Sequence, residues 1–298
     1  MTVAVQTQTT WPQSGFSPVC ALQVFGMRRS GNHAIIDWLM RNAPEAATGG
    51  VFFNNCKFGK NPQSDYGSLD IYDVSREVMP HKDIGDAARM AQAGTAPMAV
   101  VSYEDRMPQP AGQPQKASHG MADAQFNHQV IIYRSFLNWS ASLLAKIKKN
   151  TGFGATDRMR IMMLACATYA QGLDRIAGAK DLIAICYDDW MLSEEYRAGI
   201  LRALGLPERD LSRGKVQRYG GGSSFQKKAT DVDKLNSVAR DMIMAEDPEY
   251  QVLLWTAAHD LPFMERIVAH FEQDAERLAT LAESAKLHIK LTPREATP

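Results

Sequence analysis

Two glycines and two arginines stand close together near residue 30, in an order suited to binding a phosphate. Gly26 and Gly31 bound a turn that contains Arg28 and Arg29. Small residues let a backbone approach an anion, the N–H groups that begin a helix point at it, and arginine adds a matching charge. We therefore expect this turn to hold a phosphate group of a nucleotide.

The glycine spacing is that of the Walker A loop, but the residues that follow it differ. A Walker A loop continues with lysine and then serine or threonine, which contact the γ-phosphate and magnesium. Asn32 and His33 stand there instead. The sequence thus argues against a magnesium-dependent nucleoside triphosphatase. An ordinary strand-to-helix turn is the alternative for this motif alone.

A second pair of candidate ligands follows the apolar segment 129–133. Arg134 leaves the end of this predicted strand, where open α/β sheets bind ligands. Ser142 comes eight residues later on a predicted helix, from which it could reach the same anion. The alternative is that Arg134 pairs with a surface carboxylate and that Ser142 only faces a neighbour.

Together these segments resemble the sulfotransferases that use 3′-phosphoadenosine 5′-phosphosulfate as donor. In that family a loop of the type Pro-Lys-Ser-Gly-Thr-Thr, between a strand and a helix, binds the 5′-phosphosulfate. Arg29 stands at the position of the catalytic lysine, while Asn32 and His33 replace the two threonines and keep hydrogen-bonding groups. The resemblance implies donor contacts from Arg28, Arg29, Ser30, Gly31, Asn32 and His33.

Three further segments carry the resemblance. The family binds the donor's 3′-phosphate with an arginine at a strand end and a serine eight residues on, which is the spacing of Arg134 and Ser142. Residues 187–189, Tyr-Asp-Asp, match a Tyr-Glu-Asp strand end near the adenine, and residues 218–225 resemble a late basic loop over the 3′-phosphate. The resemblance adds to the expected donor site Arg134, Ser142, Tyr187, Arg218, Gly220 and Gly221.

The general base is expected just after the apolar segment 98–103. Many family members have a histidine there and others a glutamate, and this chain has Glu104 and Asp105. Partial burial would raise a carboxyl pKa toward a useful value. Glu104 is the first candidate and Asp105 the second, with His119 and His128 as alternatives. A solvated acidic turn is the competing interpretation.

The resemblance also implies a mechanism. Arg29 would stabilise the leaving phosphate, His33 or Asn32 would contact the sulfuryl oxygens, and Glu104 would deprotonate a hydroxyl or amine of a small-molecule acceptor. The donor would leave as 3′,5′-ADP, and no metal is required. Two other classes of protein remain as alternatives. One is an ATP-dependent P-loop kinase. The other is a non-catalytic nucleotide-binding protein, which is supported by Arg29 in place of the family's lysine.

Short apolar segments alternate with helical patterns along the chain. Strands are predicted at 19–25, 51–53, 98–103, 129–133 and 181–187, and helices over 34–40, 83–93, 135–149, 156–178, 194–204 and most of 231–287. Residues 56–80 are expected mainly as loop. This alternation favours an α/β fold of P-loop type with three layers: a mainly parallel central sheet and helices on both faces. We expect a flexible arm over 1–18 and a single sulfotransferase-like domain over 19–298, helical in its C-terminal part.

Composition excludes little. The chain has 298 residues, with Lys+Arg and Asp+Glu both 33, so no net charge draws it to nucleic acid or an anionic membrane. Its four cysteines lack the spacing of a metal site. No signal-peptide pattern and no apolar run of about 18 residues is present. These features predict a cytoplasmic protein without a nucleic acid or membrane partner, and they leave the oligomeric state open.

Overall fold

The computed structural model describes residues 11, 17–79, 95–109, 117–118, 121, 125–178, 180–214 and 240–284. Four of the candidate site residues lie outside them: Arg218, Gly220, Gly221 and His119. Most of the predicted arm over 1–18 and the predicted helix over 83–93 also lie outside the described residues.

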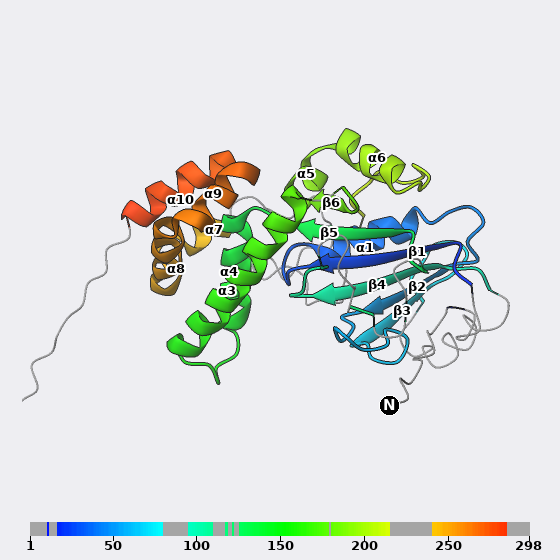
Figure 1. Cartoon of the computed structure of the whole chain (residues 1–298), viewed down its shortest axis with the longest axis horizontal. Coiled ribbons are helices and arrows are strands. Elements are labelled where there is room, and N and C mark those ends of the chain that lie inside the picture. Colours follow the sequence, from blue (N-terminus) through cyan, green and yellow to red (C-terminus); the bar gives the residue numbers. More distant parts are fainter. Residues whose placement is uncertain are drawn as a thin grey trace, which may run out of the picture.

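A six-stranded sheet with the order β3-β2-β4-β1-β5-β6 occupies the right-hand half of the molecule in Figure 1. All its strand pairs are parallel except β2–β3. Strands buried on both faces read as apolar runs, and β1 is buried along its whole length. The strands are β1 (Cys20–Gly26), β2 (Gly50–Asn54), β3 (Ser68–Tyr72), β4 (Met98–Glu104), β5 (His128–Tyr133) and β6 (Ile183–Cys186).

The five predicted strands are confirmed, with two corrections. The loop expected over 56–80 was wrong in part, because Ser68–Tyr72 forms the antiparallel edge strand β3. Its five residues alternate polar and apolar side chains, a weak signal among the surrounding Gly, Asn and Ser. The strand expected over 181–187 ends at Cys186, and Tyr187 begins a helix instead.

Nine helices lie within the described residues, and two of them, near the C-terminal end, begin at Pro248 and just before Pro262. Both prolines stand in the first turn of a helix, after Asp247 and Asp260, whose carboxylates accept hydrogen bonds from the N–H groups that begin it. The helices are α1 (Asn32–Arg41), α3 (Phe136–Ile147), α4 (Ala155–Ala177), α5 (Tyr187–Leu192), α6 (Glu194–Ala203), α7 (Arg240–Met244), α8 (Pro248–His259), α9 (Leu261–His270) and α10 (Glu272–Ser284).

The two faces of the sheet have different covers. Alternate side chains of each strand, such as Leu22 and Val24, pack against α1, α5 and α6 on one face. The opposite face packs against Trp11, against loop segments around Cys56 and Met121, and against the end of α4. Among the described residues the second cover is therefore mostly loop, whereas the sequence predicted helices.

A third core joins the helices at the end of the chain to α3 and α4. The Trp139 ring of α3 stacks on the Tyr169 ring of α4 at 4.6 Å, and the Phe136 and Phe263 rings meet edge to face at 4.9 Å. This core packs α7–α10 against α3 and α4, which lie between these helices and the sheet (Figure 1).

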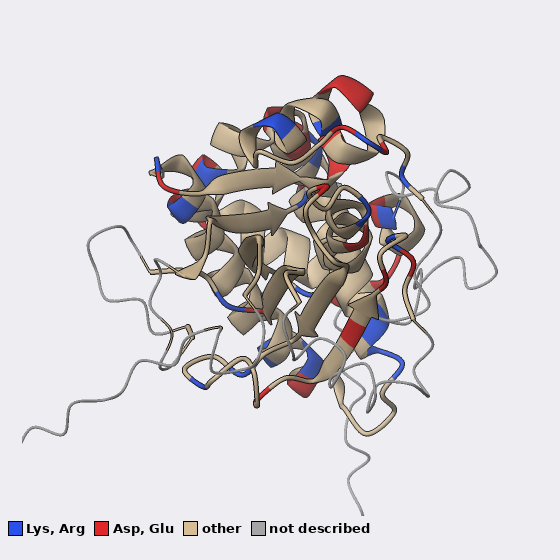
Figure 2. Ribbon diagram, turned by 90° about the vertical axis from the view of Figure 1, so that its right-hand side faces the viewer, with Lys and Arg blue, Asp and Glu red and all other residues tan. Residues whose placement is uncertain are grey.

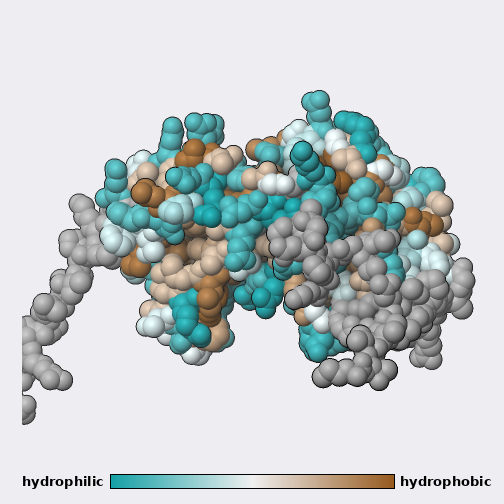
Figure 3. Space-filling view, in the orientation of Figure 1, coloured by the Kyte–Doolittle hydropathy of each residue, from teal (hydrophilic) through white to brown (hydrophobic). Residues whose placement is uncertain are grey.

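The surface shows no dominant charge. Basic and acidic residues are interspersed over the ribbon in Figure 2, and apolar residues are scattered among polar ones on the face shown in Figure 3. None of the described helices is long and apolar enough to cross a membrane.

Candidate functional site

The carboxyl ends of four parallel strands meet at one edge of the sheet. Gly26, the last residue of β1, pairs with Glu104 of β4 and Ile132 of β5, and Tyr133 pairs with Cys186 of β6. Strand β1 lies between β4 and β5, so the chain passes from one side of β1 to the other. Open α/β sheets bind ligands at such a switch point.

The loop after β1 has a tightly constrained backbone. Arg29 and Gly31 both have a positive φ, of 73° and 92°. A β-carbon on Gly31 would lie 2.0 Å from the Tyr187 ring, so only glycine fits there. The Asn32 amide donates to the Met27 carbonyl at 3.2 Å and closes the turn. No side chain caps the start of α1, which leaves its first N–H groups directed toward the loop.

Three arginines from distant parts of the chain converge beside this loop. The Ser142 hydroxyl oxygen accepts from Arg29 Nε at 3.3 Å and from Arg240 Nη1 at 3.0 Å. Arg134 is buried, with its guanidinium 4.8 Å from the centre of the Tyr187 ring and its Nε 3.4 Å from Asp188 Oδ1. Arg29, Arg134 and Arg240 are called the arginine cluster below.

The arginine cluster concentrates positive charge in a poorly solvated place. Burial lowers the pKa of Arg29, and the charge of Arg134 lowers it further, against the opposing influence of Glu104 and Tyr187. Burial, Arg134 and Arg29 together lower the pKa of Arg240 to about 9, although Tyr187 and Asp188 oppose this. Like charges held together away from water are costly, and a multiply charged anion would relieve that cost.

Glu104 and His33 lie together on the other side of the loop. His33 Nε2 is 3.9 Å from Glu104 Oε1. Burial raises the pKa of Glu104, and Asp105 raises it further, while Arg28 and Arg29 lower it. Burial and then Arg29 lower the pKa of His33. The pair therefore combines a neutral imidazole with a carboxyl group that keeps its proton to a higher pH than usual.

Asp105 is engaged with the loop. Its carboxylate accepts from the Arg28 backbone N–H at 2.8 Å and forms an ion pair with the Arg28 side chain. Its own N–H donates to the Gly26 carbonyl at 3.0 Å. These contacts give Asp105 a role in holding the loop, and they leave Glu104 as the carboxyl group beside His33.

The other predicted residues fall into two groups. Ser30 and Asn32 are buried, and Arg28 is half-exposed and paired with Asp105. His128 is the first residue of β5 and pairs with Leu22, whereas Ile132 reaches the site. Four residues of strand, about 13 Å, separate it from the carboxyl edge, so its placement as an alternative base was wrong.

Arg240 is the site residue that the sequence did not reveal. It stands alone before the short apolar segment of α7, with no motif around it. Its backbone N–H donates to Asn138 Oδ1 of α3 at 3.1 Å, and its side chain donates to Ser142, also on α3. Only the packing of α7 against α3 brings it to the arginine cluster, and no local pattern records that packing.

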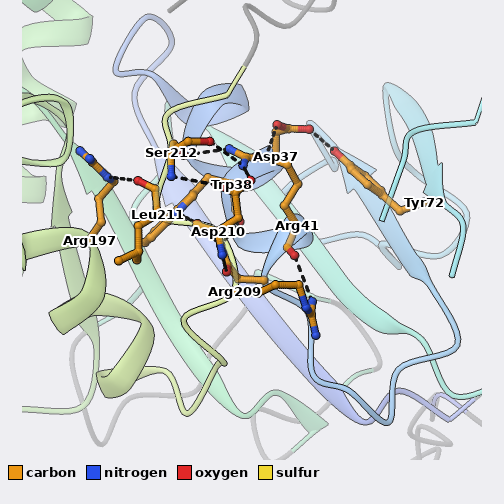
Figure 4. A network of polar contacts seen from close by, with 10 residues as sticks. Asp37, Trp38, Arg41, Tyr72, Arg197, Arg209, Asp210, Leu211 and Ser212 are labelled. Carbon is orange, nitrogen blue, oxygen red and sulfur yellow. Dashed lines mark hydrogen bonds and ion pairs between the residues drawn. The ribbon is translucent and has the colours of Figure 1, made fainter. Parts of the chain in front are cut away.

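Helix α1 is anchored firmly at the end away from the loop (Figure 4). Trp38 Nε1 donates to the Asp210 carbonyl at 2.9 Å, and Asn42 exchanges two hydrogen bonds of 2.8 Å with the same backbone. The Trp38 ring also meets the Trp190 ring edge to face, and Trp190 stacks on Tyr187. These contacts fix α1 and Tyr187 relative to each other and so fix the loop between them.

Comparisons with known proteins found no relative. No family model, no curated protein and no solved structure matched the chain. Within the described ranges, no three His, Cys, Asp or Glu side chains are grouped so as to hold a metal ion. The case for a function therefore depends on the residues described above.

Proposed function

We propose that the protein is a sulfotransferase of the P-loop-type, three-layer fold, which transfers a sulfuryl group from 3′-phosphoadenosine 5′-phosphosulfate to a hydroxyl or amine of a small acceptor. The observation that carries the proposal is the convergence of Arg29 and Arg240 on Ser142 beside the β1–α1 loop, with Arg134 held over the Tyr187 ring. A donor with charged groups at both its 5′ and 3′ ends suits a loop and a separate arginine cluster.

Ser142 supports a phosphate at the arginine cluster. Its oxygen already accepts hydrogen bonds from Arg29 and Arg240. A hydroxyl has two acceptor positions and one proton to donate. Since both acceptor positions are used, the proton is the group left to bind an anionic oxygen. Arg134 and Arg240 supply the charge, and we assign this place to the 3′-phosphate.

The loop and the Glu104–His33 pair supply the groups for transfer. The acceptor oxygen or nitrogen forms a bond to sulfur while the bond from sulfur to the 5′-phosphate oxygen breaks, and Glu104 takes the acceptor's proton. Arg29 and the loop N–H groups stabilise the charge on the leaving oxygen, and His33 contacts the sulfuryl oxygens. Positioning and charge stabilisation carry most of the catalysis in the closely similar transfer of phosphoryl groups.

A thermal-shift experiment tests the donor. The product 3′,5′-ADP should raise the melting temperature without magnesium, because a ligand that binds only the folded chain stabilises it. The control is ATP with magnesium at the same concentration. If ATP with magnesium raises the melting temperature and 3′,5′-ADP does not, the proposal is contradicted and a kinase is favoured.

A non-catalytic nucleotide-binding protein is the second candidate. Arg29, at the position of the catalytic lysine, donates to Ser142. Such a protein would bind 3′,5′-ADP but transfer no sulfuryl group. An ATP-dependent kinase has less support, because Asn32 stands where its lysine is needed and is bound to the Met27 carbonyl.

A further inference from the structure

The last described helix, α10, contacts the two segments that carry Arg134 and Arg240. Arg277 of α10 forms an ion pair with Asp241, the residue after Arg240, with 2.5 Å between Nη2 and Oδ2. Three residues earlier, Asp274 lies against the Ser135 hydroxyl and the Leu137 backbone N–H at the start of α3. One helix face thus reaches both sides of the arginine cluster.

Helix α7 needs such support. Its described residues, Arg240–Met244, pack mainly against α3. Its place is therefore set by contacts with other helices. Arg240 is tied to Asn138 and Ser142 of α3. On its other side Asp241 is tied to α10.

The Arg277–Asp241 pair is a strong constraint because Asp241 is fully buried. Burial raises the pKa of Asp241, and the charge of Arg277 lowers it. A buried carboxylate that loses its ionic partner is strongly destabilising. Asp241 therefore keeps α7 against α10, and any shift of Asp241 would move Arg240, its neighbour in the chain.

Asp274 acts on the other arginine-bearing segment. Burial raises the pKa of Asp274, and the charges of Asp188 and Asp241 raise it further. Interactions with Ser135 and the Leu137 backbone lower it. A carboxyl group at the start of α3 also faces the positive end of that helix. Ser135 directly follows Arg134.

We propose that α10 positions the arginine cluster. Arg277 holds Arg240 in place through Asp241, and the packing of α10 against α3 supports the helix that follows Arg134. This inference rests on the proposed function, because it takes the 3′-phosphate of the donor as the ligand of both arginines. Arg277 and Asp241 are positioning residues that do not touch the donor.

The test is a calorimetric titration of the full chain with 3′,5′-ADP and with 5′-AMP, which lacks the 3′-phosphate. Arg277→Met removes the charge and keeps the apolar stem. The affinity for 3′,5′-ADP should fall about tenfold, the size of one lost charge-assisted hydrogen bond. The affinity for 5′-AMP should stay unchanged. Arg266→Met is the matched control, since it breaks the Arg266–Asp174 pair of 2.7 Å between α9 and α4 and should change neither affinity.

A double variant separates positioning from general damage. Arg277→Met alone leaves Asp241 buried without its ionic partner, so its melting temperature should fall. Adding Asp241→Asn removes that charge and should restore the melting temperature, while 3′,5′-ADP still binds weakly. Recovery of both quantities would overturn the inference.

The two levels of the proposal fail differently. If the wild-type chain binds 3′,5′-ADP no better than 5′-AMP, the proposed function fails and the inference fails with it. If the wild-type chain prefers 3′,5′-ADP and Arg277→Met keeps that preference in full, only the role of α10 is overturned.

Discussion

At the scale of single residues, the site divides into a cationic half and an acid–base half, with Arg29 between them. Arg29 donates to Ser142, and its charge acts on both Glu104 and His33. A bound donor that engages Arg29 would therefore change the proton affinity of the Glu104–His33 pair. Donor binding and acceptor activation would be linked through one guanidinium.

The pH dependence of transfer should follow Glu104. Its pKa is raised above the ordinary 4.5 by burial and by Asp105, and a general base acts only when ionised. Turnover should therefore rise with pH through this raised pKa and be lost as the pH falls through it. Steady-state rates across pH, at saturating donor, measure this limb.

Glu104→Gln should abolish transfer without loss of stability. A carboxyl group whose pKa is raised by folding contributes stability that is present at low pH and lost as the pH rises through the folded pKa. At neutral pH the variant should thus melt at the same temperature as the wild type or above it. An active variant would contradict the role of Glu104. Asp105→Asn is the control. It should loosen the loop but keep the loss of turnover at low pH that depends on Glu104.

At the scale of elements, the loop is held between α1 and the start of α5. The contact between Gly31 and the Tyr187 ring leaves no room for a side chain. The apolar contacts from Trp38 through Trp190 to Tyr187 tie that ring to α1. The loop is thus preorganised before any ligand arrives, which lowers the cost of ordering it on binding.

Gly31→Ala should therefore be costly. It combines a positive φ of 92° with a clash against Tyr187, and we expect a loss of roughly 1–3 kcal/mol in the free energy of unfolding, together with loss of nucleotide binding. Gly205→Ala is a matched control, because Gly205 has a φ of 66° with nothing within 4 Å. Equal costs in thermal denaturation would contradict the proposed contact.

The sequence predicted the elements that a short stretch of residues specifies by itself. Five buried strands stand out as apolar runs, and the loop after β1 is bounded by its glycines. Strand β3 was missed because its signal is short. His128 was misplaced because it lies at the amino end of β5, whereas Glu104 lies at the carboxyl edge of the sheet. Tyr187 was expected to end a strand, yet it begins α5 while still reaching the loop.

At the scale of the whole molecule, the arginine cluster joins the sheet to the C-terminal helices. Arg29 leaves β1, Arg134 follows β5, and Arg240 begins α7, so more than a hundred residues separate each from the next. The sequence predicted the first two, through a loop motif and a strand end. The third depends on how α7–α10 pack against α3 and α4, which no local pattern specifies.

A crystal structure with 3′,5′-ADP tests the central claim most directly. The 5′-phosphate should lie on the N–H groups of the β1–α1 loop, and the 3′-phosphate should accept hydrogen bonds from Arg134, Ser142 and Arg240. Glu104 should face an open space beside the 5′-phosphate, on the acceptor side. A nucleotide whose 3′-phosphate lies away from the arginine cluster, or one bound at another edge of the sheet, would contradict the account.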